Sequence, residues 1–104
     1  MISVNSPRFK LGQVVATPAA LATLERFGKS VWHYVSRHVN GDYGDLSEDD
    51  KQANDDALID GSRILSSYII EGEGDDASKL WIITEAEDDE GNRIATTALL
   101  SHEY

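Results

Sequence analysis

Three apolar segments rich in β-branched residues fill much of the C-terminal part of the chain, and their spacing limits the folds open to it. They span residues 63–70, 80–86 and 94–100. Acidic connections that contain glycine separate them. Segments of this length and composition are typical of strands, and short turn-rich connections join antiparallel neighbours. The sequence therefore predicts a three-stranded antiparallel meander here.

The N-terminal part carries helix signals instead. Thr17 offers a hydroxyl N-cap and Pro18 occupies the first helical position, so a helix is predicted from there to about Gly28. Further helices are predicted over residues 30–39 and over residues 47–61, the latter with three acids in its first turn. Before the first helix, the short apolar stretch at residues 11–16 is predicted to be a strand.

These signals together predict an α+β fold. Two or three N-terminal helices would pack on a small antiparallel sheet, made of the C-terminal meander with residues 11–16 as a candidate fourth strand. The chain has 104 residues, which is the usual size of one domain. We therefore expect a flexible lead-in over residues 1–10 and a single domain over residues 11–104.

The charge of the chain is divided unevenly between its two parts. Residues 1–41 hold five bases and one acid, a balance of +4, whereas residues 42–104 hold four bases and eighteen acids, a balance of −14. The resulting net charge of −10 disfavours direct binding to nucleic acid or to an anionic membrane, because both need clustered Lys and Arg. With no cysteine, disulfides and Cys-ligated zinc are excluded, and we expect a cytoplasmic protein.

The predicted third helix concentrates carboxylates that could meet a basic partner. Asp49, Asp56 and Asp60 fall on one face, about 10 Å and then about 6 Å apart along the axis. Such a row could imitate DNA phosphates, whereas the simpler interpretation is a solvated helix face. Tyr43, flanked by acids in a loop, is either an interface anchor or a ring folded back onto the helix. The candidate partner-binding residues are Asp42, Tyr43, Asp45, Asp49, Asp55, Asp56 and Asp60.

Patterns expected of catalytic or metal sites are missing from the sequence. No register of acids and glycine matches an EF-hand loop, and neither a Gly-x-Ser-x-Gly elbow nor a phosphate-binding Gly-rich loop with lysine occurs. His33 and His38 lie about 140° apart around a helix, so they would not share a metal ion. We expect both to be surface or half-buried residues. The sequence thus predicts no cofactor, metal or catalytic residue, and a protein that is not an enzyme.

Several stretches of the sequence, taken in order, carry a resemblance to known proteins. They are residues 12–21, 37–46, 61–68, 81–86 and 96–104. Their combination resembles a family of small bacterial proteins associated with plasmids and other mobile elements. The resemblance implies no particular reaction, cofactor or catalytic residue.

Two functional hypotheses follow. In the first, the acidic face binds a basic protein surface, and the resemblance to mobile-element proteins gives this its sharper form, an inhibitor of a host DNA-binding or defence enzyme. In the second, the chain is a self-associating module. The basic region of one copy meets the acidic region of another, either head to tail or in a two-fold homodimer, and the acids otherwise serve solubility.

Overall fold

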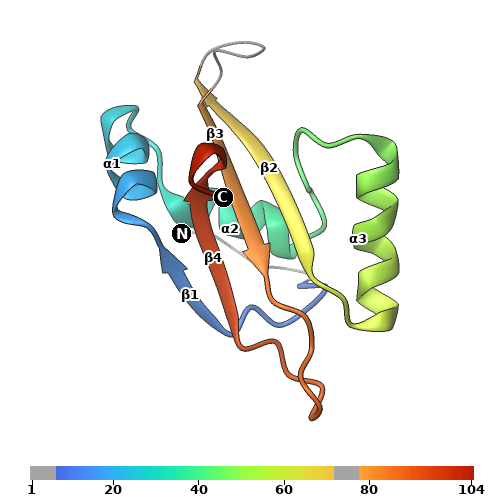
Figure 1. Cartoon of the computed structure of the whole chain (residues 1–104). Helices are drawn as coiled ribbons and strands as arrows, with labels where there is room; N and C mark the ends of the chain where they lie inside the picture. The colour runs from blue at the N-terminus through green and yellow to red at the C-terminus, as the bar shows by residue number, and fades with distance from the viewer. Residues whose placement is uncertain (1–6, 72–77) are drawn as a thin grey trace.

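The computed structural model describes residues 7–71 and 78–104. Figure 1 shows one sheet with α2 behind it and α3 standing beside β2. A 3₁₀ turn, η2 (Ser101–Glu103), follows the last strand. The other elements, in chain order, are β1 (Gln13–Ala16), α1 (Pro18–Arg26), α2 (Val31–Val39), α3 (Glu48–Asp60), β2 (Ile64–Glu71), β3 (Ser78–Thr84) and β4 (Ala95–Leu100).

The α+β fold class is confirmed, but the sheet is mixed and not antiparallel throughout. Its strand order is β1-β4-β3-β2, and β2, β3 and β4 form the predicted antiparallel meander. The prediction of a wholly antiparallel sheet is wrong at β1, which pairs in parallel with β4. Three helices and two strands separate β1 from β4 along the chain, and a connection of that length can bring a strand back in either direction.

The helices begin where their capping residues predict. The hydroxyls of Thr17, Ser30 and Ser47 each accept a hydrogen bond from a backbone N–H in the first turn of the following helix, at 3.1, 3.2 and 3.1 Å. These bonds satisfy donors that a helix start otherwise leaves unpaired. At the other end of α3, Gly61 takes the left-handed conformation (φ +81°) that terminates a helix.

The main core lies on the sheet face that α1 and α2 cover. Alternate residues of the strands point to this face, as the pleat requires. Its buried apolar residues are Ala20, Leu24, Tyr34, Val35, Tyr68, Ile70, Leu80, Ile82, Ala98 and Leu100. On the opposite face, the ring of Tyr104 lies 5.4 Å from that of Trp81, which remains partly exposed.

The outer edge of β2 is covered by side-chain and loop groups instead of another full strand. The Asn54 amide on α3 donates to the Leu65 carbonyl (2.7 Å) and accepts from the Leu65 N–H (3.1 Å), as a neighbouring strand would. Further along β2, the Ser67 N–H donates to the Tyr43 carbonyl and the Ser67 carbonyl accepts from the Asp45 N–H. These two bonds form a one-residue bridge between Gly44 and Ser67. These contacts fix α3 and the loop before it against the sheet.

Residues 1–6 of the expected lead-in and residues 72–77 of the first acidic connection lie outside the described residues. The rest of the lead-in is held to the fold: the Arg8 N–H donates to the Val39 carbonyl (2.8 Å), its Nε donates to the Asn40 carbonyl (3.0 Å), and Phe9 packs against a second small core. Within residues 7–71 and 78–104, no helix has the length and apolar character needed to cross a membrane.

Candidate functional site

Helix α3 is an outward-facing acidic element held by few buried side chains. Only Asn54 and Ala57 are buried along its length, and the carboxylates project into solvent. Glu48, Asp49 and Asp50 lie in the first turn, where negative charge complements the positive end of the helix dipole. Those three acids therefore have a structural role as well as a place on the surface.

Three of the predicted site residues, Asp49, Asp56 and Asp60, lie on the exposed side of this helix. The Asp56 carboxylate accepts from the Gln52 side chain (3.0 Å), and the Asp60 carboxylate accepts from the Ser62 N–H (2.8 Å). Hydrogen bonding from Ser62 lowers the pKa of Asp60. In the described part of the chain, the ion pair on α3 is the loose one between Lys51 and Glu48 (3.8 Å). The other carboxylates of the helix are thus available to an external cation.

Asp42 and Asp45, which the sequence predicted as partner-binding residues, each have an intramolecular cation partner in the structure. Asp42 forms an ion pair with Arg37 (2.7 Å), and Asp45 forms one with Lys79 (3.5 Å). The hydrogen bond from Arg37 lowers the pKa of Asp42. Because each carboxylate already has an intramolecular cation, these two residues do not add free negative charge to the helix row.

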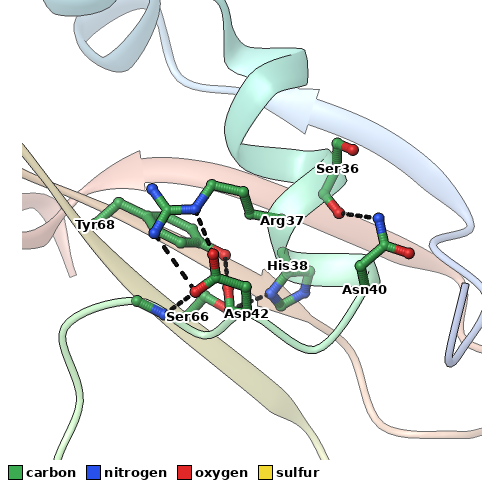
Figure 2. Close-up of polar contacts among 8 residues, drawn as sticks. Ser36, Arg37, His38, Asn40, Asp42, Ser66 and Tyr68 are labelled. Carbon is green, nitrogen blue, oxygen red and sulfur yellow. Dashed lines mark hydrogen bonds and ion pairs between the residues drawn. The ribbon is translucent and has the colours of Figure 1, made fainter. Parts of the chain in front are cut away.

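Arg37, Asp42 and Tyr68 form a polar cluster beside β2 (Figure 2). The Arg37 guanidinium stacks over the Tyr68 ring, 4.6 Å from its centre, and donates to both oxygens of Asp42 at 2.7 and 3.4 Å. The Tyr68 hydroxyl donates to the Asp42 carbonyl (2.6 Å). An open cleft of about 350 Å³ lies here, also lined by Asp45 and Ile69. Its charges are internally paired, so the cluster fixes the loop before α3.

Tyr43 is buried, so the interpretation as an exposed interface anchor is corrected. Only 4% of its surface is exposed, and it packs with Ala57 and Ile64, the alternative in which the ring folds back onto the helix. Two glycines and two acids surround Tyr43 in the sequence, a loop pattern that gives no sign of this packing. Its buried hydroxyl has no hydrogen-bond partner within 3.5 Å among the described residues, and the Asp55 carboxylate on α3 lies near enough to act on it. Burial, and then the charge of Asp55, raise the pKa of Tyr43.

Replacing Tyr43 with phenylalanine is expected to stabilise the protein by about 1 kcal/mol. The substitution removes a buried hydroxyl that has lost its hydration and has no partner at good hydrogen-bond distance, while the packed ring remains. Urea denaturation of the wild type and of Tyr43→Phe gives the change in the free energy of unfolding. A loss of 1 kcal/mol or more would mean that the hydroxyl has a bonding partner in solution.

His38, expected at the surface or half-buried, is fully buried at the centre of a hydrogen-bonded chain. Its Nδ1 lies 2.6 Å from the Ser66 hydroxyl and its Nε2 lies 2.8 Å from the Thr84 hydroxyl. The Thr84 hydroxyl contacts that of Thr96 (2.7 Å), which donates to the Leu11 carbonyl (2.7 Å). The apolar stripe of α2 at Val31 and Val35 continues to position 38, which is the signal that sequence reasoning missed.

The chain of hydroxyls fixes the tautomer of His38. Thr96 uses its only proton on the Leu11 carbonyl, so Thr84 must donate to Thr96. Thr84 can then only accept from His38, which places the ring proton on Nε2 and leaves Nδ1 to accept from Ser66. Burial lowers the pKa of His38 to about 3, consistent with a neutral ring.

The Ser66–His38 pair has the separation of a nucleophile and its base, but both residues are fully buried. A hydrolytic role would need a substrate to reach the Ser66 hydroxyl, and the sheet and α2 enclose it. The hydrogen-bonded series of His38, Ser66, Thr84 and Thr96 is therefore a structural network in the core. Among residues 7–71 and 78–104, no group of three or more His, Asp or Glu side chains is arranged to hold a metal ion.

No protein-family model, curated protein or solved structure matches this chain.

Proposed function

We propose that this protein is a non-enzymatic binding domain whose acidic helix α3 engages a basic surface on another protein. The proposal rests on two features of α3. The side chain of Asn54 fixes the helix against the sheet, and its outer carboxylates, except that of Glu48, have no ion-pair partner in the described part of the chain. A rigid row of charges lowers the entropic cost of binding and steers a basic partner to it.

An exposed apolar side chain within the acidic surface adds a second reason to favour a protein partner. Ile59 is 89% exposed and follows Asp55 and Asp56 by one helical turn. On a partner with a small apolar socket inside a basic rim, Ile59 would be the buried centre and the carboxylates the polar rim.

The resemblance to mobile-element proteins suggests what the partner would be. Proteins that handle DNA present basic grooves, and a mobile element gains from blocking a host enzyme that cuts or regulates DNA. We therefore propose an inhibitor of a host DNA-binding or defence enzyme as the specific form of the function. Its target is a basic groove that α3 occupies in place of DNA phosphates.

The test compares binding by wild type and by Asp49→Asn/Asp56→Asn/Asp60→Asn. The partner is captured from lysate by the wild type and purified, and affinities are then measured at low and moderate salt. We expect the triple variant to bind about tenfold more weakly or worse, and wild-type affinity to fall steeply with salt. The asparagines keep the acceptors that Gln52 and Ser62 use, so the helix itself should remain intact.

The matched control removes three charges elsewhere. Glu85→Gln/Asp89→Asn/Glu90→Gln changes the net charge equally, at exposed positions in the connection before β4. If the control binds the partner with wild-type affinity and Ile59→Ser binds it more weakly, the interface lies on α3. Equal binding by the wild type, the α3 triple variant and the control would contradict the proposal and leave the acids a solubilising role.

Self-association is the alternative that one structural observation favours. Figure 1 places α1 and α3 toward opposite edges of the sheet, and the bases Arg26 and Lys29 lie at the end of α1 and just after it. Copies joined through these two sides would associate head to tail. Light scattering across a range of protein and salt concentrations separates the two functions, because the binding domain stays monomeric without its partner.

A further inference from the structure

A buried arginine without a carboxylate partner lies at the opposite end of α3 from its acidic first turn. Arg93 is only 7% exposed, and no carboxylate in the described part of the chain lies within ion-pair distance of it. Its guanidinium donates instead to three backbone carbonyls, those of Ser62 (2.7 Å), Glu85 (3.0 Å) and Ala57 (3.0 Å). Carbonyls satisfy hydrogen bonds, but none of these contacts is an ion pair, and the guanidinium otherwise lies 5.9 Å from the centre of the Phe9 ring.

This arginine retains donors that the protein does not use. A guanidinium has five N–H groups, and three of them are committed to the carbonyls. Among the described residues, the remaining two have no acceptor. Both hydrogens of Nη1 are donated, to the Ser62 and Glu85 carbonyls, and one hydrogen of Nη2 is donated to the Ala57 carbonyl. The unused donors are therefore Nε–H and the second hydrogen of Nη2. A guanidinium fixed in this way by its other bonds is preorganised to bind an oxyanion.

The arginine lines a small pocket that gathers further positive charge. The pocket has a volume of about 200 Å³, and its walls include Arg8, Lys10 and Arg93 together with Glu87 and the ring of Phe9. Arg8 is held in place by its bond to the Asn40 carbonyl (3.0 Å), whereas the Lys10 side chain is exposed. Three bases against one acid make a positive site on a protein whose net charge is −10.

We propose that this pocket binds a phosphate group, with Arg93 as the buried anchor and Arg8 and Lys10 at the rim. Phosphate fits because its oxygens can accept from a guanidinium fork and its charge is neutralised by the bases around it. The field of the whole protein repels anions, so a phosphate held here depends on these local contacts. The site lies at the C-terminal end of α3, where Arg93 bonds the Ala57 carbonyl, and it does not rest on the function proposed for the acidic face.

Titration with inorganic phosphate, followed by NMR of the arginine Nε–H signals, tests the proposal on the intact chain. We expect a saturable shift of the Arg93 Nε–H signal that sodium chloride of equal ionic strength does not produce. Methyl phosphate is the second probe: tighter binding than phosphate would indicate a phosphoester ligand, and equal binding would indicate the free anion. If neither inorganic phosphate nor methyl phosphate produces a saturable shift of the Arg93 Nε–H signal, the proposal is overturned.

Charge variants separate the pocket from the general field. Lys10→Gln is expected to weaken phosphate binding about two- to fivefold, and Glu87→Gln to strengthen it by a similar factor. Lys29→Gln removes the same charge as Lys10→Gln but lies between α1 and α2, and should leave the affinity unchanged. Arg93 is not substituted, because its hydrogen bonds to three backbone carbonyls support the fold. Equal weakening by Lys10→Gln and Lys29→Gln would show that no local site exists.

Discussion

Acidification from pH 7 to pH 4.5 is expected to lower the free energy of unfolding by about 2.5 kcal/mol through His38 alone. The pKa of His38 falls from 6.5 to about 3 in the folded protein because the ring is buried. The folded state therefore favours the neutral ring. Its contribution to stability is fully present above pH 6.5 and is lost progressively as the pH falls toward 3, since the unfolded chain takes up the proton first.

The pH window isolates this histidine from the carboxylates whose pKa values are shifted. Asp42, Asp60 and Glu103 have pKa values lowered by their hydrogen bonds, chiefly from Arg37, Ser62 and the Leu100 N–H. Their contributions are present above the ordinary carboxyl range and are lost only as the pH drops through it. Measurements between pH 7 and pH 4.5 therefore report mainly on the buried imidazole.

The matched variant is His38→Gln, whose amide supplies both a donor group and an acceptor group but cannot take up a proton in this range. We expect it to be less stable than the wild type at pH 7, with the difference shrinking on acidification. Urea denaturation at several pH values measures both curves, and NMR of the wild type should show no titration of the His38 ring above pH 4.5. Parallel curves, or a ring that titrates near pH 6.5, would show that the imidazole is solvated.

The elements that sequence reasoning located correctly are those that local signals determine. Thr17, Ser30 and Ser47 cap helices because a hydroxyl bonds backbone donors a few residues away, and that geometry is contained in the nearby sequence. The meander is also local, because each of its strands pairs with the next one along the chain. Such features need no knowledge of the distant parts of the chain.

What sequence reasoning missed depends on contacts between distant residues. The parallel pairing of β1 with β4 joins Val14 to Thr96, and nothing in either segment specifies the direction. The polar core chain requires that His38, Ser66 and Thr84 face the same interior point, which only the packed helix and sheet reveal. For the same reason, the intramolecular cations of Asp42 and Asp45 could not be predicted from spacing.

Gly44→Ala is expected to destabilise the protein by about 3 kcal/mol or more, and to loosen α3 first. Gly44 has a positive φ of +77°, and a Cβ built there would lie 2.2 Å from the Ser67 carbonyl oxygen and 2.6 Å from the Tyr68 ring. The substitution therefore adds a steric clash with backbone and core to the conformational cost of a left-handed residue. Urea denaturation measures the loss.

Gly91→Ala is the matched control, because Gly91 has nearly the same φ of +79° but nothing within 4 Å of its Cβ position. It should cost only the conformational term, about 1 kcal/mol. The difference between the two variants measures how tightly the Gly44 bridge is packed against β2. Equal losses would mean that the loop moves away from Ser67 at little cost.

The location of the damage follows from what the bridge holds. The Asp45 N–H donates to the Ser67 carbonyl (2.6 Å), and Ser47, two residues later, is the N-cap of α3, so the bridge sets where the helix starts. Displacing it should weaken the contact of Asn54 with the β2 edge before the main core under α1 and α2 is affected. Hydrogen exchange of Gly44→Ala is therefore expected to be faster in α3 and in the Leu65 amide, and nearly unchanged in β3 and β4.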